Sequence, residues 1–349
     1  MSERRIFLFS LSAIILLILL LSLFSFAVSN IKFTSNKLYS NQSGRVYNSV
    51  LINNFDFDSI ILGSSMSQGS KCSVFDSAFG GKSMKLACSA INFAEIEFFV
   101  GHAAGKKRIR RVIFDAPVMF FSRRQSTEDI PAEYYQDNIK FVLYKKSFSI
   151  NALTESLSEA KNLIRKKTRH VSRDELYDWN IGRKCGEKYF AQALLYGEET
   201  QFGFGEELFR KSKTALEQHL IPMFERHPDT EFILFFPPFS MMYYRSFDHR
   251  AYIKLKGEIA ERLLAVKNVK LYDFETAFHI MEDFENYRDT NHYSGRINSW
   301  MMQQMAQGNY LLTKDNKQQS LDKLLKRFET YDFAGEYGRI KTKYAGKRK

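Results

Sequence analysis

The chain has 349 residues, 44% of them hydrophobic and 26% charged, so it can form a large globular domain and is not of the disordered class. Its formal net charge of +12 favours anionic partners, but no finger, basic-zipper or RNP-type pattern accompanies the charge, so nucleic acid is not an expected partner. Three cysteines without a CxxC spacing argue against a disulfide framework, and no histidines or acids cluster at ligand spacing, so we expect no metal and no cofactor.

The first element is an apolar run over residues 6–29, which contains no charged residue. A helix of this length spans roughly 35 Å, enough to cross a hydrocarbon core of roughly 30 Å. Arg4 and Arg5 precede the run, so the positive-inside rule places the amino terminus in the cytoplasm and the body outside. The alternative is a cleaved signal peptide, because residues 27–29 resemble a cleavage site, but the length favours a signal-anchor. The pattern predicts a single-pass protein of the inner (cytoplasmic) membrane with a periplasmic or extracellular body.

The body alternates short apolar runs with longer amphipathic segments. Five runs are predicted to be buried strands, at residues 59–62, 84–88, 111–114, 231–236 and 269–272. Such runs separated by helical segments are typical of an α/β fold with a central parallel sheet. The predicted divisions are a cytoplasmic amino terminus (1–5), a transmembrane anchor (6–29), a juxtamembrane segment (30–54), an α/β domain (55–310), and a helical segment with a flexible basic tail (311–349).

Residues 125–201 have a helical and polar pattern in which aromatic residues such as Trp179 lie among Lys and Arg. We interpret this segment as a helical insertion or a lid over the edge of the sheet. Two basic clusters, at residues 106–111 and 339–349, are either solvated surface or a patch held near an anionic membrane or polymer.

Polar residues follow the predicted strands, where parallel sheets form their sites. Ser65 comes just after the first strand, at a turn that can expose its hydroxyl beside backbone N–H groups. His292 follows Asp289 by three residues on a loop, so the carboxylate can orient the imidazole. His249 is a weaker candidate for the base. The alternative is that Ser65 caps a helix and that the Asp-His pair belongs to an ordinary surface turn.

These motifs resemble a known family. Strand-Gly63-Ser64-Ser65 and the later Asp289-x-x-His292 are similar to the first and last blocks of the SGNH (GDSL-type) hydrolase superfamily. The anchor, the Pro-Pro stretch at 235–240 and the run 289–294 resemble the DltD-like membrane-anchored branch and its relatives in surface-polysaccharide gene clusters. The resemblance covers roughly residues 55–305 and implies a flavodoxin-like three-layer sandwich with a central parallel sheet.

The resemblance also implies roles for individual residues. Ser65 is the expected nucleophile, His292 the general base and then acid, and Asp289 the acid that orients the imidazole. The Ser65 N–H is one expected oxyanion donor, and Ala90 and Asn92 are candidates for others.

Two blocks depart from the family pattern. Ser89-Ala90 stands where the second block has glycine, and Asp115 ends the strand where the third block has Gly-x-Asn-Asp. The implied chemistry is an acyl-enzyme on Ser65, resolved by water in an esterase or by a sugar hydroxyl in an O-acyltransferase. The expected substrate is a cell-envelope polysaccharide or glycopolymer, and the expected partner is a membrane-bound O-acyltransferase. The departures leave open a catalytically inactive SGNH-fold binding or scaffold protein in surface-polysaccharide assembly.

Overall fold

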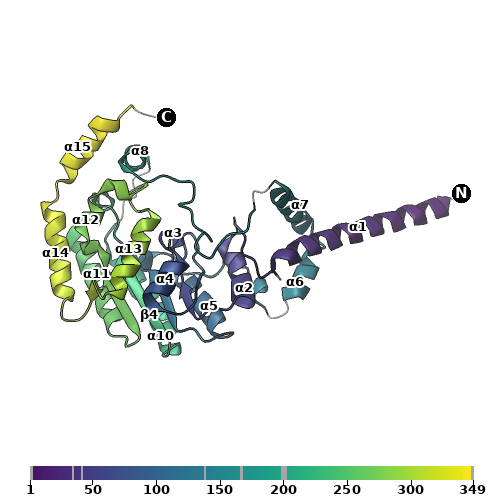
Figure 1. Ribbon diagram of the computed structural model, residues 1–349, viewed down its shortest axis with the longest axis horizontal. Helices are drawn as coiled ribbons and strands as arrows, with labels where there is room; N and C mark the ends of the chain where they lie inside the picture. The colour runs from purple at the N-terminus through teal and green to yellow at the C-terminus, as the bar shows by residue number, and fades with distance from the viewer. Residues whose placement is uncertain are drawn as a thin grey trace. The chain divides into compact units, whose positions relative to one another are not determined.

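The computed structural model describes residues 3–33, 35–40, 42–136, 139–165, 168–197 and 203–346. The chain forms two compact units (Figure 1). Unit 1 consists of Met1–Phe55 and Glu128–Ser172, and unit 2 consists of Asp56–Thr127 and Arg173–Lys349. The segment 125–201, which the sequence marked as one insertion, is therefore shared between the two units.

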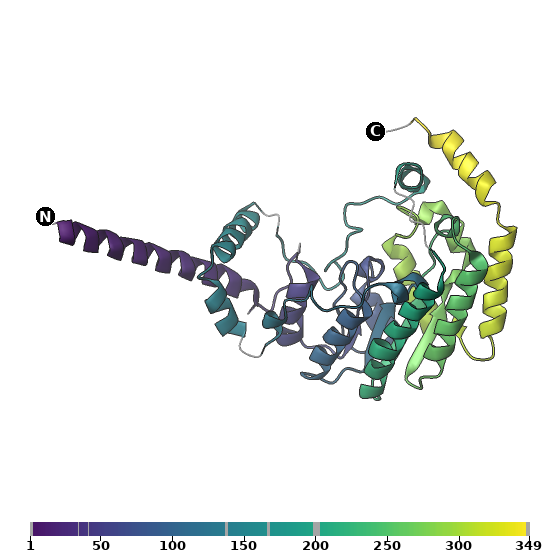
Figure 2. The same cartoon turned by 180° about the vertical axis from the view of Figure 1, so that it is seen from behind.

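Unit 1 is helical. Its elements are α1 (Glu3–Phe33), α2 (Gly44–Asn54), the 3-10 helix η2 (Ala132–Tyr135), α6 (Ile139–Lys146) and α7 (Ile150–Ile164). The stretch Arg5–Asn30 of α1 is long and apolar enough to cross a membrane, as the run 6–29 predicted. Both α6 and α7 contact α1, beside its carboxyl-terminal half in both views (Figures 1 and 2).

Unit 2 is built on a six-stranded sheet of order β2-β1-β3-β4-β5-β6. The strands are β1 (Ser59–Ile61), β2 (Ser83–Lys85), β3 (Arg111–Asp115), β4 (Glu231–Phe236), β5 (Val269–Asp273) and β6 (Leu311–Leu312). The first five are parallel and each overlaps one of the five predicted runs, although β2 (Ser83–Lys85) shares only two residues with the run at 84–88; β6 pairs antiparallel with β5. The predicted α/β fold with a mostly parallel central sheet is confirmed. The sequence did not predict β6, because a strand of two residues is too short to show an alternating or apolar pattern.

Helices and 3-10 turns connect the strands of unit 2. They are α3 (Ser65–Gln68), α4 (Cys72–Phe79), α5 (Phe93–Ala104), η1 (Val118–Ser122), α8 (Glu187–Tyr196), α9 (Glu206–Ala215), η3 (Leu216–Leu220), α10 (Ile221–Arg226), η4 (Met241–Tyr244), α11 (His249–Leu264), η5 (Phe274–Thr276), α12 (Phe278–Met281), η6 (Phe284–Asn286), α13 (Gly295–Ala306), α14 (Lys317–Thr330) and α15 (Phe333–Tyr344). From β1 the chain first adds β2 on one side, and then adds β3, β4 and β5 in turn on the other side of β1. Because crossovers between parallel strands are right-handed, this change of direction places helices on both faces of the sheet. Accordingly α4 packs with α13 in front of the sheet in Figure 1, and α10 and α11 lie in front in Figure 2.

The end of the chain differs from its prediction. Residues 333–344, expected to be a flexible tail, form α15, because its basic side chains find acidic partners. Arg339 and Lys343 both pair with Glu187 of α8, and the Lys343 Nζ lies 2.5 Å from the carboxylate. The last three basic residues of the predicted tail, 347–349, lie outside the described residues.

Candidate functional site

A sharp turn after β1 positions the first candidate residue. Gly63 has a φ of +113°, a conformation that favours glycine. A Cβ at this position would lie 2.1 Å from Asp115 Oδ1 and 2.5 Å from Ser67 Oγ. The missing side chain therefore lets the end of β3 approach the turn that begins α3.

Asp115 holds this turn. Its carboxylate, almost fully buried, accepts hydrogen bonds from the Ser64 N–H (2.8 Å), the Ser64 hydroxyl (2.6 Å) and the Ser67 hydroxyl (2.5 Å). Burial raises the pKa of Asp115 above its ordinary value, and the three donated hydrogen bonds oppose that rise. Asp115, the residue that departs from the family pattern, thus fixes Ser64 and Ser67, which lie on either side of Ser65 and Met66.

Ser65 is the first residue of α3, and Ser64 is its N-cap, with a hydroxyl that accepts the Met66 N–H. Among the described residues, no acceptor binds the Ser65 N–H. A free N–H at the start of a helix is a donor for developing negative charge. The sequence assigned this N–H as an oxyanion donor, and its geometry leaves it available for that role.

The structure brings Ser65, His292 and Asp289 together, although 227 residues separate the serine from the histidine. Ser65 Oγ lies 2.9 Å from His292 Nε2. His292 Nδ1 lies 2.9 Å from Asp289 Oδ2 and 3.0 Å from Oδ1, so Nδ1–H donates to the carboxylate and leaves Nε2 to accept the serine proton. All three side chains are partly exposed, as residues that meet a substrate must be.

The Asp289 carboxylate is ionised in this arrangement. Burial alone would raise the pKa of Asp289, but hydrogen bonds from His292 and Asn291, together with the attraction of the imidazole, bring the pKa below its ordinary value. The backbone N–H of His292 donates at 2.7 Å and that of Asn291 at 3.1 Å. Backbone groups of the loop therefore bind the Asp289 carboxylate and fix its position next to the imidazole.

The histidine loop rests on the segment that follows β4. The Tyr287 hydroxyl donates to the Pro238 carbonyl at 2.6 Å, and the Ser240 N–H and hydroxyl both donate to the Thr290 carbonyl. A bridge between Tyr287 and Tyr293 closes the loop. The Pro-Pro stretch that contributed to the family resemblance is thus hydrogen-bonded to the loop that carries the candidate base.

Trp179 is a site residue that the sequence did not identify. Its indole N–H donates to the Ser65 carbonyl at 2.6 Å, and its ring meets the His292 ring edge to face, with centroids 5.3 Å apart. Sequence reasoning placed this tryptophan in a lid, because an aromatic residue in a polar segment carries no signal of the partner that it will contact.

Three side chains hold the carbonyls of α3. The Trp179 indole binds the Ser65 carbonyl, and the Asn298 amide of α13 binds the Met66 carbonyl at 2.9 Å. The Lys85 ammonium of β2 binds the Gln68 carbonyl at 2.8 Å. Helices this short leave their carbonyls without partners of their own, so these donors fix the nucleophile turn. Lys85 also binds the Asp174 carbonyl at 2.9 Å, and burial lowers its pKa to about 8. The sequence analysis did not identify Lys85, because a lysine among apolar residues does not indicate which backbone groups it will bind.

The two further oxyanion candidates differ in their surroundings. Asn92 is the N-cap of α5, and its side-chain amide donates to Glu95 Oε2 (3.1 Å) and to the Ser126 carbonyl (2.8 Å), so both amide hydrogens are engaged. Ala90 lies in an exposed turn with a φ of +54°, and its N–H has no acceptor among the described residues. A hydrogen bond from the Cys88 N–H to the Gly63 carbonyl, 3.1 Å long, ties this turn to the nucleophile turn.

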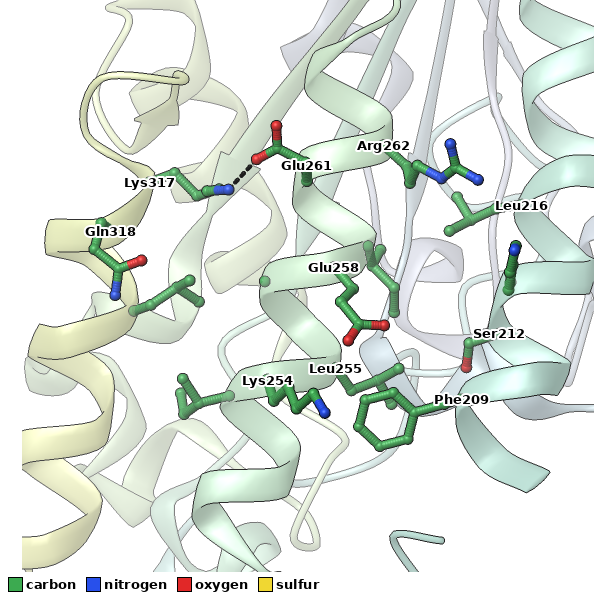
Figure 3. Close-up of a pocket in the computed structure, with 15 residues that line it drawn as sticks. Phe209, Ser212, Leu216, Lys254, Leu255, Glu258, Glu261, Arg262, Lys317 and Gln318 are labelled. Atoms are coloured by element: carbon green, nitrogen blue, oxygen red, sulfur yellow. Dashed lines mark hydrogen bonds and ion pairs between the residues drawn. The ribbon is translucent and has the colours of Figure 1, made fainter. Parts of the chain in front are cut away.

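Other features lie away from Ser65. The weaker base candidate, His249, stacks on Phe328 and Phe333 and binds the Tyr244 carbonyl. A cavity of about 600 Å³ opens between α9, α11 and α14, and Figure 3 shows that both apolar side chains, such as Phe209 and Leu255, and charged ones, such as Glu258, line it. In the part of the chain that the structure describes, no three His, Cys, Asp or Glu side chains gather as metal ligands, and all three cysteines are free.

No family model matches the chain, and no curated protein is similar enough to match it. The chemical interpretation of the site therefore rests on its own geometry.

Proposed function

We propose that the chain is a membrane-anchored, SGNH-like serine esterase or O-acyltransferase of the DltD-like branch, which acts on a cell-envelope polysaccharide or glycopolymer. The observation that carries this proposal is the continuous hydrogen-bonded line from Ser65 Oγ through His292 to Asp289. A hydroxyl, an imidazole and an ionised carboxylate in this order are the parts of an activated serine nucleophile.

In the proposed reaction, Ser65 Oγ attacks the ester carbonyl while His292 Nε2 takes its proton. The Asp289 carboxylate stabilises the imidazolium, and the Ser65 N–H and Ala90 N–H bind the oxyanion. His292 then gives the proton to the leaving alcohol, and the acyl group stays on Ser65. In the second half, His292 removes a proton from water or a sugar hydroxyl, which attacks the acyl group and restores the serine.

The topology supports the family assignment. The five parallel strands follow the order 2-1-3-4-5, the order of flavodoxin-like doubly wound sheets, whose sites lie outside the carboxyl ends of the strands. Ser65 follows β1 and Asp115 ends β3, so both lie at that edge. A three-layer SGNH-like sandwich is the fold that we infer from this order.

The envelope substrate is inferred from the anchor and the charge. The apolar stretch of α1 and the two arginines before it favour an exported body, and the net charge of +12 suits an anionic polymer. Exported acyl groups need a source, so a membrane-bound O-acyltransferase is the proposed partner for the transferase reaction.

The test is acyl turnover by the full-length protein in detergent with isolated, O-acetylated envelope polymer. Wild type is expected to release or transfer acetate. In Ser65→Ala, the rate of acetate release or transfer is expected to fall to the background rate. Ser77→Ala is the matched control, because this exposed serine lies on α4 away from the triad, and it should behave as wild type. Equal turnover in wild type and Ser65→Ala would exclude an acyl-enzyme on Ser65, and binding of the polymer without turnover would favour the scaffold function.

A further inference from the structure

Two of the helices that contact α1 in unit 1, α6 and α7, carry large exposed apolar side chains. On α7, Ile150 is 80% exposed, Leu157 52% and Ile164 81%. These residues are seven positions apart, and seven residues turn a helix by nearly two full turns, so the three side chains form one stripe. Isolated exposed apolar residues are common on soluble proteins, but three large ones on one face of a helix favour a surface that another apolar phase covers.

A second group of exposed apolar side chains lies on α6 and the turn after it, and α6 lies on the other side of α1 from α7 (Figure 1). Phe141, Tyr144 and Phe148 are each about half exposed; Phe141 and Tyr144 are three residues apart on α6 and share a face, and Phe148 lies in the turn after α6. The rings of Tyr144 and Phe148 meet edge to face with centroids 5.1 Å apart. Residues 139–164, which we call the α6–α7 hairpin because a turn joins the two helices, thus have an aromatic group on α6 and an aliphatic group on α7, and both helices contact α1.

The hairpin packs on the apolar stretch of α1 through small polar residues. Ser156 Oγ of α7 lies 3.0 Å from Ser25 Oγ of α1 and donates to the Ser25 carbonyl at 3.3 Å, and both serines are buried. Phe26 of α1 meets Tyr144 of α6 edge to face. Small residues joined by serine hydrogen bonds are typical of helix pairs within lipid, where the backbones approach closely.

This contact fixes the depth of the hairpin. Ser25 lies five residues before Asn30, where the apolar stretch ends, or about 7.5 Å at the helical rise. Amphipathic helices at a membrane surface bury their apolar face by about 5–10 Å. Exposed basic residues adjoin the apolar face, among them Lys145 and Lys161, whose ammonium groups can reach headgroup phosphates.

We propose that the α6–α7 hairpin is a second membrane element, seated in the leaflet at the carboxyl end of α1 with its apolar stripe in the acyl chains. The partner of this surface is the lipid bilayer that α1 crosses. The proposal rests on α1 being a membrane span and is independent of the chemistry at Ser65. In it, residues 139–164 lie on lipid and are not a lid.

The test measures the surroundings of single nitroxide labels on the full chain, with Cys72, Cys88 and Cys185 replaced by serine. The protein is reconstituted into vesicles of phosphatidylcholine and phosphatidylglycerol, and collision rates with oxygen and with a water-soluble nickel chelate are compared. A label at Leu157 is expected to collide more with oxygen than with nickel. The matched control is a label at Glu155, two residues or about 200° around α7, which should show the opposite preference.

Two results would overturn the proposal. Equal nickel collision rates at positions 157 and 155 would place the stripe in water, and protection of position 157 from both reagents would place it against protein. Ile150 and Ile164 offer two further label sites, and because both are about four-fifths exposed, a label there does not disturb packing. Circular dichroism that matches wild type confirms that each labelled chain is folded.

Discussion

The position of the Ser65 hydroxyl depends on side chains that bind the backbone around it. Asp115 holds the serine before it, and Trp179 and Lys85 hold carbonyls of the short helix that it begins. None of these three belongs to the proposed triad, yet each restricts where the hydroxyl can lie relative to His292. They are positioning residues, and their effects are expected on the reactivity of Ser65 or on folding.

Trp179→Phe should slow the reaction of Ser65 with a fluorophosphonate by up to about tenfold, the kinetic equivalent of one hydrogen bond. The phenyl ring keeps the wall beside His292 but has no N–H for the Ser65 carbonyl. The measurement is the rate constant of covalent labelling. Trp300→Phe, a change in a tryptophan that packs on Phe274 and Tyr310, is the control and should label at the wild-type rate. A Trp179→Phe rate equal to wild type would show that the carbonyl contact has no effect on Ser65.

Lys85→Met should destabilise the fold by about 1–3 kcal/mol for the buried Gln68 carbonyl that loses its donor, and by less for the part-buried Asp174 carbonyl, which water can reach. The effect should depend on pH. Because burial lowers the pKa of Lys85 from 10.5 to about 8, protonation disfavours the folded state between these values. The stability that Lys85 contributes is therefore complete above pH 10.5 and decreases as pH falls through about 8.

Chemical denaturation at a series of pH values checks this sign. The free energy of unfolding of wild type, minus that of Lys85→Met, is expected to rise as pH increases from about 8 to 10.5. A difference that stays flat over this range would show that the ammonium is not desolvated in the folded protein.

At the scale of the elements, the turn between β1 and α3 is expected to tolerate substitution poorly, because Gly63 combines a positive φ with a close contact. Gly63→Ala places a methyl group 2.1 Å from Asp115 Oδ1 in a backbone conformation that disfavours side chains, so the turn must open or the chain must fail to fold. Gly308→Ala is the matched control, because Gly308 has a φ of +76° and no atom within 4 Å of its Cβ position.

The free energy of unfolding of Gly308→Ala should fall by about 1–2 kcal/mol, which is the cost of a side chain in a left-handed backbone conformation. That of Gly63→Ala should fall by several times as much. Thermal unfolding of the two variants compares them directly. Equal losses would mean that the contact with Asp115 adds nothing to the strain at Gly63.

The sequence predicted elements well where a local pattern decides them. Five apolar runs gave five strands, and the spacing of Asp289 and His292 indicated a loop that orients an imidazole. It failed where partners come from elsewhere in the chain. The helix α15 forms beside Glu187, more than 140 residues before it, and β6 exists only through its pairing with β5.

The same limit applies to the candidate site. Ser65, Asp289 and His292 could be named because residue type and spacing indicate their chemistry. Trp179 and Lys85 could not, since their role lies in contacts with carbonyls that any residue could have supplied. For Asn92 the sequence indicated the residue but not its partners: its side chain caps α5, and its amide hydrogens bind Glu95 and the Ser126 carbonyl.

At the scale of the whole molecule, the chain combines a helix long enough to cross a membrane with a parallel sheet that carries a serine site. Unit 1 contains the apolar stretch of α1 and the exposed apolar side chains of α6 and α7, whereas unit 2 contains Ser65, His292 and Asp289. We propose that unit 1 anchors the protein in the envelope membrane and that unit 2 carries out the acyl chemistry.

Mass-spectrometric location of a fluorophosphonate adduct tests this chemistry most directly. The full-length protein is treated with the probe and digested, and the modified residue is identified in wild type and in His292→Gln. We predict an adduct on Ser65 in wild type and a rate of adduct formation lower by about a thousandfold or more in His292→Gln, because the serine loses its base. No adduct on wild-type Ser65, or one that forms equally fast without the imidazole, would contradict the assignment of Ser65 as an activated nucleophile.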